Sequence, residues 1–164
     1  MQGNNRTDAL IGLADIFLAD AIIIGLKNGT KRGVIEELVY HLVQVGRIKV
    51  EEERGIVESL LVREKLRTTA LGNGIAFPHC RAKCTESCVG VLGIEPRGVF
   101  FDSLDGEMVQ SVFLMVLPLE ITETHYETLG RISALARNKS QRFQLNGYRR
   151  SEAVHRFLRD LDRK

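Results

Sequence analysis

Cysteine is scarce in this sequence of 164 residues: it occurs three times, and the odd number excludes a closed framework of disulfide bonds. We therefore expect a reducing compartment, because disulfides persist mainly in oxidising ones. An excess of charge of either sign is also missing, since 23 lysines and arginines balance 21 aspartates and glutamates for a net charge of +2. A general nucleic-acid-binding protein carries a marked basic excess, so this class is excluded.

A hydrophobic run long enough to cross a membrane is missing as well. The most apolar stretch near the N-terminus covers residues 9–26, but Asp15 and Asp20 interrupt it, and each carboxylate is costly in a bilayer. Only Arg6 precedes this stretch as a positive charge, and no small-residue cleavage pattern follows it, which argues against a signal peptide. The sequence therefore predicts a cytoplasmic protein without membrane insertion.

Strand and helix patterns alternate along the whole length. Apolar runs of the strand type cover residues 21–24, 88–94 and 109–117. Apolar residues recur at helical spacing in residues 30–46, 50–64, 122–136 and 151–161. Pro96, Gly98, Asp105 and Gly106 predict turns between the last two strands. The alternation and the length predict an α/β fold in a single compact domain over residues 1–164, with a central mixed β-sheet flanked by helices on both faces.

His79 stands where a functional side chain is expected. It follows a Gly-rich turn, a short apolar segment at residues 75–77 and Pro78, which predicts a stiffened loop at the C-terminal end of a strand. In α/β proteins this position commonly carries binding and catalytic residues.

The other three histidines fall at predicted helices. His125 opens one that Thr122 or Thr124 can cap, and the free N–H groups at a helix start attract anions. His41 and His155 lie within amphipathic helix patterns, where a structural histidine is expected. Together with His79, His125 therefore indicates a site for an anion or a phosphoryl group.

Arg63 ends the second predicted helix and has two interpretations. Its positive charge at the C-terminal end of the helix interacts favourably with the macrodipole, and this interaction alone would explain an arginine there. Alternatively, its guanidinium presents a planar fork of N–H donors that suits the oxygens of a phosphoryl group.

These residues belong to an ordered set of motifs. Arg63 and Glu64 are followed by residues 69–79, which read TALGNGIAFPH. Further segments follow in order: GVFFDSLDG at residues 98–106, an apolar strand ending in proline at residues 112–118, and Thr124-His125. The set resembles the signature of the fructose/mannitol-class IIA domains of the bacterial phosphotransferase system, which reads R-E, then T-G-I-G-x-G-I-A-[IV]-P-H, G-I-x-F-x-x-x-D-G and a second histidine at a helix start. The resemblance covers residues 8–162.

The resemblance implies a role for each of three side chains. His79 would accept a phosphoryl group from the phosphocarrier protein HPr, Arg63 would contact the phosphoryl oxygens, and His125 would hydrogen-bond the phosphoryl group or the first imidazole. It also implies that no metal or other cofactor takes part and that a cysteine of a IIB domain is the next acceptor. The residue types suit this chemistry, because imidazole is a nitrogen nucleophile near neutral pH and phosphoryl transfer depends mainly on positioning and charge.

The Gly-rich turn is expected to add backbone N–H groups to the phosphate site. Gly72, Asn73 and Gly74 are the residues concerned, because glycine lets the backbone approach a ligand closely. The sequence departs from the family pattern nearby, with Ala70 in place of a glycine and Phe77 in place of a β-branched residue. Both departures affect the local shape and leave the three candidate side chains unchanged.

Cysteine recurs every four residues directly after His79, at Cys80, Cys84 and Cys88. The spacing of the first two is permissible for zinc, but a matched second pair is missing, so packing of small side chains is the favoured interpretation.

Charge is distributed unevenly. Residues 85–130 contain eight acidic side chains and one arginine, whereas residues 137–164 contain nine basic side chains and three acidic ones. Ordinary solvated faces explain this pattern, and so does an acidic face that steers a basic protein partner toward the site. The C-terminal segment has the periodicity of a packed helix, and we expect no nucleic-acid partner.

Two functions from different classes remain open. One is a phosphohistidine carrier that serves a IIB partner in sugar transport. The other is a regulatory binding module of the nitrogen-related type, which acts on target proteins in one phosphorylation state without obligatory onward transfer. Asn73 and the Thr124-His125 context favour the nitrogen-related type.

Overall fold

The structure, a computed structural model, describes residues 11–164. Within this range the α-helices are α1 (Leu13–Ile16), α2 (Lys31–Gln44), α3 (Glu53–Leu66), α4 (Glu123–Arg137), α5 (Lys139–Gly147) and α6 (Ser151–Asp162). The strands are β1 (Ile22–Ile24), β2 (Ile75–Ala76), β3 (His79–Arg81), β4 (Val89–Val99) and β5 (Val109–Leu117), and two short 3₁₀ helices cover Ala19–Ala21 and Val50–Glu52. Every predicted strand and helix within the described residues is present, with boundaries that shift by a few residues.

The five strands form one mixed sheet in the order β1-β4-β5-β2, and β3 also pairs with β5. Only β4 and β5 run antiparallel, whereas β1, β2 and β3 each run parallel to their neighbour. The chain between the parallel strands β1 and β4 contains α2 and α3. Strands β2 and β3 run parallel to β5 because β4 intervenes along the chain and runs in the opposite direction. The predicted mixed sheet is therefore confirmed.

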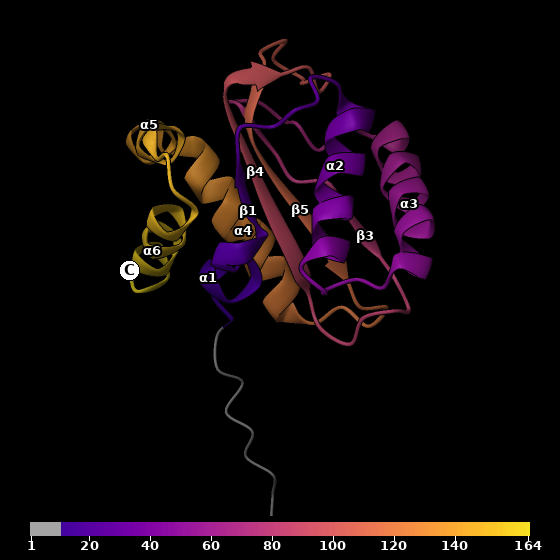
Figure 1. Cartoon of the computed structure of the whole chain (residues 1–164). Coiled ribbons are helices and arrows are strands. Elements are labelled where there is room, and N and C mark those ends of the chain that lie inside the picture. The colour runs from indigo at the N-terminus through magenta and orange to yellow at the C-terminus, as the bar shows by residue number, and fades with distance from the viewer. Residues whose placement is uncertain (1–10) are drawn as a thin grey trace, which may run out of the picture.

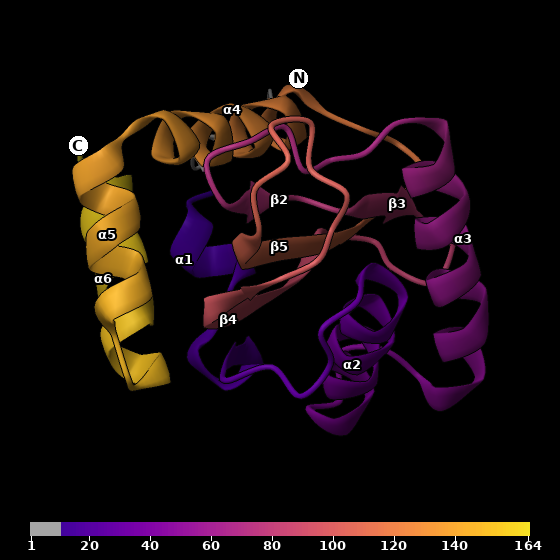
Figure 2. The same ribbon diagram turned by 90° about the horizontal axis from the view of Figure 1, so that it is seen from above.

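Helices cover both faces of this sheet, as predicted. Helices α2 and α3 pack on one face, and α1, α4, α5 and α6 lie on the other (Figures 1 and 2). Alternate side chains of β5 separate the two cores: Leu114 enters the cluster under α2 and α3, whereas Phe113 and Met115 enter the opposite one.

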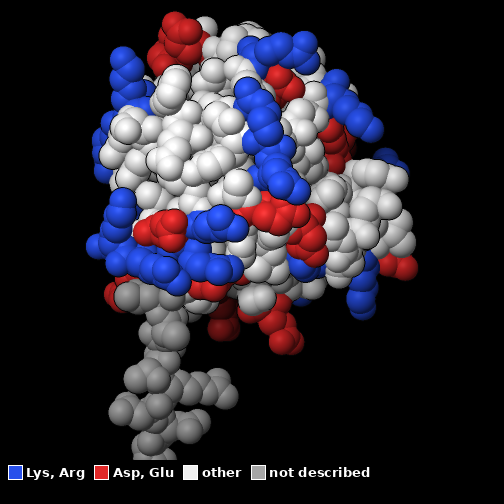
Figure 3. Space-filling view, turned by 60° about the vertical axis from the view of Figure 1, so that its left-hand side comes forward, with Lys and Arg blue, Asp and Glu red and all other residues white. Residues whose placement is uncertain are grey.

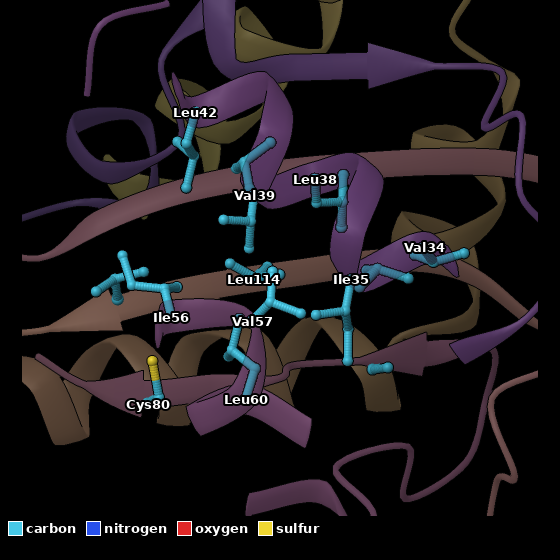
Figure 4. Close-up of a cluster of buried hydrophobic side chains, with 14 of the residues drawn as sticks. Val34, Ile35, Leu38, Val39, Leu42, Ile56, Val57, Leu60, Cys80 and Leu114 are labelled. Carbon is cyan, nitrogen blue, oxygen red and sulfur yellow. The ribbon is translucent and has the colours of Figure 1, made fainter. Parts of the chain in front are cut away.

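The cluster under α2 and α3 is shown in Figure 4. Leu38 and Leu42 of α2 and Leu60 of α3 are completely buried there against Leu114 of β5. Each side chain of this kind contributes about 1.5–3 kcal/mol when it is fully removed from water. The apolar faces of the two helices therefore fix them on the sheet, and α3 in turn carries Arg63 to its C-terminal end.

Two features differ from the sequence-based expectation. The predicted turn at Pro96 and Gly98 is wrong, because β4 continues to Val99 through a register shift that begins after Ile94. A strand tolerates proline at such an irregularity, where no ladder hydrogen bond is needed from its nitrogen. Helix α5 was not among the predicted helices; its sequence has only one fully buried residue, Leu145, and so lacks an apolar period.

The apolar stretch near the N-terminus forms short elements. Its described part contains the four-residue helix α1, a 3₁₀ turn and β1. Among the described residues, no helix is long and apolar enough to cross a membrane.

Candidate functional site

A cavity of about 510 Å³ opens where β3, the edge strand, lies between α3 and α4. Helix α3 contributes Arg63, β3 contributes His79, and the first turn of α4 contributes His125. The structure thus brings together the three side chains that the sequence analysis singled out. Other lining residues are Ser59, Val62, Leu66, Cys80, Arg81, Leu117, Ile121, Tyr126 and Leu129.

Strand pairing determines the direction of His79. The residue begins β3 rather than lying on a loop, and it pairs in register with Met115 of β5. Register partners point to the same face, and Met115 faces the side of α4. Cys80 points to the opposite face, into the cluster under α2 and α3 (Figure 4). The alternation of the strand therefore directs the imidazole toward the helix that carries His125.

A hydrogen bond fixes which nitrogen of His79 holds the proton. Nδ1 lies 2.8 Å from the carbonyl oxygen of Phe77, which can only accept, so Nδ1–H donates and Nε2 keeps its lone pair. The Phe77 ring stacks on the imidazole, with ring centroids 6.1 Å apart and planes 10° apart. The pKa of His79 is lowered, mainly by burial; the hydrogen bond to Phe77 opposes this shift, the charge of Arg63 adds to it, and the charge of Glu64 opposes it least. His79 is therefore a neutral imidazole with a free Nε2 at neutral pH.

His125 has the opposite tautomer. It is the third residue of α4, and its Nδ1 accepts a hydrogen bond of 2.9 Å from the backbone N–H of Thr122, the N-cap residue. A peptide N–H can only donate, so the proton of the neutral ring is on Nε2. The side chain is buried, and this burial lowers its pKa. The predicted helix start at Thr122 is confirmed, and the histidine itself completes the cap.

Arg63 rests on a backbone carbonyl at the rim of the cavity. Its Nη1 donates a hydrogen bond of 2.9 Å to the carbonyl oxygen of Arg67, in the chain that follows α3. Among the described residues, no carboxylate forms an ion pair with Arg63. The remaining N–H donors of its guanidinium are available for an anion in the cavity.

Glu64, the neighbour of Arg63, anchors the same segment. Its buried carboxylate accepts hydrogen bonds from the backbone N–H and the hydroxyl of Thr69, and it lies 3.5 Å from Nζ of Lys31. Lys31 also lies over the ring of Phe101, 5.3 Å from its centroid. The glutamate and threonine of the motif therefore hold the chain that positions Arg63, rather than contacting the cavity.

The Gly-rich turn lies away from this cavity, so its predicted contribution to phosphate binding at His79 is corrected here. Gly72, Asn73 and Gly74 do not line the cavity. The carbonyl oxygen of Gly74 accepts hydrogen bonds from the backbone N–H groups of Gln110 and Ser111 of β5. Ser111 lies four residues before Met115, the register partner of His79. Four residues of strand span about 13 Å. The glycines serve a different purpose, because φ is positive at all three turn residues.

The three cysteines differ in burial: Cys80 is buried, Cys88 is partly buried and Cys84 is exposed. Burial raises the pKa of Cys80 to about 12 and that of Cys88 to about 12, so both stay protonated thiols at neutral pH. Cys84 is exposed on the turn after β3. No group of three or more His, Cys, Asp or Glu side chains that could hold a metal ion occurs among the described residues.

The two other histidines have structural roles, as expected. Nε2 of His41 lies 2.7 Å from the carbonyl oxygen of Asp20, and Nε2 of His155 lies 2.9 Å from that of Ala14. Sequence reasoning missed Arg81, a second guanidinium at the cavity. It lies two residues after His79 in an extended segment, and the alternation of strand side chains would have placed both on one face.

The acidic stretch of residues 85–130 divides between two ends of the molecule. Glu120, Glu123 and Glu127 are exposed at the start of α4, beside the cavity. Asp102 and Asp105 belong to the loop between β4 and β5, at the other end of the sheet (Figure 1). Only the first group is placed to steer a partner toward His79.

The chain is similar to proteins of one bacterial phosphotransferase family. A sequence model described as phosphoenolpyruvate-dependent sugar phosphotransferase system, EIIA 2, matches residues 15–161. A nitrogen regulatory protein of Bradyrhizobium diazoefficiens is 32% identical over 146 residues, which are 89% of this chain and 94% of the relative. The crystal structure of the nitrogen regulatory protein IIA-Ntr from Neisseria meningitidis superposes with a TM-score of 0.80 at 28% identity, covering 88% of this chain and 97% of that one. The IIA mannitol enzyme of Escherichia coli, solved in complex with phosphorylated IIB, gives a TM-score of 0.71 at 25% identity, covering 87% and 96%.

Proposed function

Because this chain belongs to the EIIA 2 family of the phosphoenolpyruvate-dependent sugar phosphotransferase system, we propose that it is a phosphohistidine carrier that accepts a phosphoryl group on Nε2 of His79. The observation that carries the proposal is the hydrogen bond from Nδ1 of His79 to the carbonyl of Phe77, which leaves the Nε2 lone pair free at the cavity. The donor is an HPr-type phosphocarrier protein, docked at the open edge of the sheet.

The transfer step needs no proton movement at the acceptor. The Nε2 lone pair of His79 forms the bond to phosphorus while the bond between phosphorus and the donor breaks, and that electron pair returns to the donor. The proton stays on Nδ1 throughout, and its hydrogen bond to the Phe77 carbonyl holds the ring in place. Such pre-orientation is the main contribution a protein makes to phosphoryl transfer.

Two neighbours stabilise the phosphoryl group in this proposal. Nε2–H of His125 donates to a phosphoryl oxygen, because the Thr122 hydrogen bond keeps its proton on that nitrogen. Arg63 turns from the Arg67 carbonyl to the phosphoryl oxygens, which are stronger acceptors because they are charged. The residues thus supply an imidazole donor and a guanidinium fork to a developing negative charge.

We expect the rate of phosphoryl uptake to stay constant from alkaline pH through neutrality and to fall only in more acidic solution. Protonation of His79 removes the lone pair of Nε2, and burial with the nearby Arg63 charge lowers the pKa of this residue below the ordinary value of about 6.5. Titration of the His79 ring by NMR, alongside single-turnover uptake rates, checks this. A His79 pKa at or above the ordinary value contradicts the proposed environment.

The experiment that tests the carrier function is intact mass after incubation with phosphoenolpyruvate, enzyme I and a cognate HPr. The expected product is one phosphoryl adduct that is stable in base and lost in acid, as for a phosphohistidine. Omission of HPr is the matched control and leaves the chain unmodified. No adduct with the complete system would contradict the carrier function and favour a binding module.

The onward partner is a IIB domain or a regulatory target protein. Similarity to proteins named nitrogen regulatory protein favours the regulatory use, in which target binding depends on the state of His79. Binding of the unphosphorylated and phosphorylated chain to a purified IIB domain separates the two uses. Loss of the phosphoryl group to the IIB cysteine supports transport, and its retention supports regulation.

A further inference from the structure

The end of the molecule opposite the phosphoryl cavity exposes several large apolar side chains. Five of the twelve large hydrophobic side chains that are exposed among the described residues lie here: Leu71, Phe100, Leu104, Met108 and Phe143. Phe143 is 83% exposed and Leu104 is 62% exposed. Apolar patches of this kind on a folded protein mark contact surfaces.

The first four of these side chains belong to two loops that hydrogen bonds hold together, which we call the apical loops (residues 70–74 and 100–108). The carbonyl of Ala70 accepts hydrogen bonds from the backbone N–H of Leu104 and the hydroxyl of Ser103. The carboxylate of Asp105 accepts from the N–H of Asn73 at 2.9 Å and from the hydroxyl of Ser103 at 2.7 Å. The apolar side chains are therefore presented on a fixed support, at little entropic cost on binding.

Phe143 belongs to helix α5, which adjoins the apical loops through β5. Gln110, two residues after Met108, accepts a hydrogen bond of 2.9 Å from the amide of Asn146. Gln110 and Asn146 form part of a surface hollow of about 430 Å³ that Phe143 also lines. Figure 1 places α5 and the loop between β4 and β5 at the same end of the molecule, and Figure 2 views that end directly.

Charges of opposite sign divide this end. Lys139, Arg142 and Arg149 line the hollow of α5, whereas the apical loops carry three exposed carboxylates, Asp102, Asp105 and Glu107. None of these six charges forms an ion pair with another described residue. In Figure 3 acidic groups lie at the top of the view, above an uncharged area that basic groups frame.

We propose that this end of the molecule is the interface of a two-fold symmetric dimer with a second copy of this chain. A partner that covers the whole end must present acidic side chains to α5, basic ones to the apical loops and apolar ones to the centre. A second copy turned by half a revolution presents this arrangement, because each apical loop then meets the basic helix of the other molecule. The two phosphoryl cavities stay open at the far ends of the dimer.

Two of the three basic side chains are held in a fixed orientation by hydrogen bonds. Nη1 of Arg149 donates to the carbonyls of Asn146, Gly147 and Tyr148 at 3.1–3.2 Å, and Arg142 donates to the carbonyl of Ala136. These bonds orient the guanidinium groups without neutralising them. Arginine and aromatic residues in such positions are the side chains that most often dominate protein interfaces.

Sedimentation velocity of the full chain, from micromolar to millimolar concentration and at low and high salt, tests the proposal. We expect a concentration-dependent dimer that weakens at high salt, because screening acts on charge pairs at an interface rim. The variant Phe143→Ser should raise the dissociation constant about tenfold or more. Its phosphoryl uptake should be unchanged, which separates this proposal from the carrier function.

Charge reversal provides the sharpest version of the test. Lys139→Glu and Glu107→Lys should each weaken the dimer, whereas the double variant should restore part of the loss, because this one pair of opposite charges is then re-formed with its signs exchanged. Lys139 is the first residue of α5, where glutamate favours the helix, so the fold tolerates this change. Lys49→Glu, an exposed residue before α3, is the charge-matched control and should leave the dimer intact.

Two results would overturn the proposal. A chain that stays monomeric at millimolar concentration and low salt has no such interface. A dimer that neither Phe143→Ser nor the single charge reversals weaken is formed by another surface.

Discussion

Replacement of His79 by alanine is expected to abolish phosphoryl uptake completely while leaving the fold intact. The side chain supplies the nucleophilic Nε2, and no other nitrogen with a free lone pair and a fixed orientation faces the cavity, because His125 holds its proton on Nε2. The imidazole is only half-buried and makes one hydrogen bond to the backbone of Phe77, so its loss costs about 1 kcal/mol of stability. Intact mass after incubation with the complete donor system measures the effect.

The matched control for this variant is His41→Ala. That change also removes one imidazole and one hydrogen bond to a backbone carbonyl, but on α2 and away from the cavity. Its uptake should equal that of the unchanged chain. A phosphoryl adduct on His79→Ala would move the acceptor to another residue and contradict the proposed site.

Substitution of Arg63 by lysine is expected to slow phosphoryl uptake by about 10- to 100-fold. Lysine keeps the charge but lacks the planar fork of N–H donors. A charge-assisted hydrogen bond contributes about 1.5–3 kcal/mol, and a loss of about 1.4 kcal/mol in the transition state slows the rate tenfold. The side chain rests on the Arg67 carbonyl in the unphosphorylated protein, so the loss falls on the transfer step more than on the fold. Single-turnover rates with excess phosphorylated HPr measure it.

Arg67→Lys is the control for this second prediction. It makes the same chemical change four residues later, on an exposed side chain whose backbone carbonyl remains in place to hold Arg63. We expect an uptake rate within about twofold of the unchanged chain, as is usual for surface substitutions. Equal rates for Arg63→Lys and the unchanged chain would remove Arg63 from the phosphoryl site.

The sequence was most informative where side-chain periodicity was strong. Residues 109–117 are a continuous apolar run and residues 151–161 have a clear helical period, and both elements appear near the expected bounds. The strand is buried on both faces, whereas the helix buries one. The motifs also identified Arg63, His79 and His125, which meet at one cavity although 62 residues separate the first from the last. The sequence predicted that these three residues share a site because their motifs occur in the same order as in the family signature.

The sequence was less informative where long-range contacts decide the structure. The Gly-rich turn looked like a phosphate cradle, but the pairing of Gly74 with the start of β5 places it at the opposite end of the sheet. Pro96 indicated a turn, yet β4 continues because its neighbours shift register around it. Helix α5 has one buried residue, Leu145, and its Asn146 hydrogen-bonds Gln110 and Ser111 of β5, contacts that no local pattern predicts.

The role of Glu64 also became visible only in three dimensions. The sequence showed Glu64 only as the neighbour of Arg63 in the motif, whereas in the structure its carboxylate is buried against Thr69 and Lys31. Burial of a carboxylate requires hydrogen bonds and an opposite charge, and both partners here come from outside α3. In this motif Arg63 faces the cavity, whereas Glu64 anchors the segment after α3 whose Arg67 carbonyl holds Arg63.

The most direct test of the central claim is the position of the phosphoryl group on the imidazole ring. Nitrogen-15 and phosphorus-31 NMR of the phosphorylated chain distinguishes the two ring nitrogens and the four histidines. We predict a single phosphohistidine at His79 with the phosphorus on Nε2. Nδ1 should remain protonated and donate its hydrogen bond to the Phe77 carbonyl. Phosphorus on Nδ1 of His79, or on any other histidine, would contradict the account.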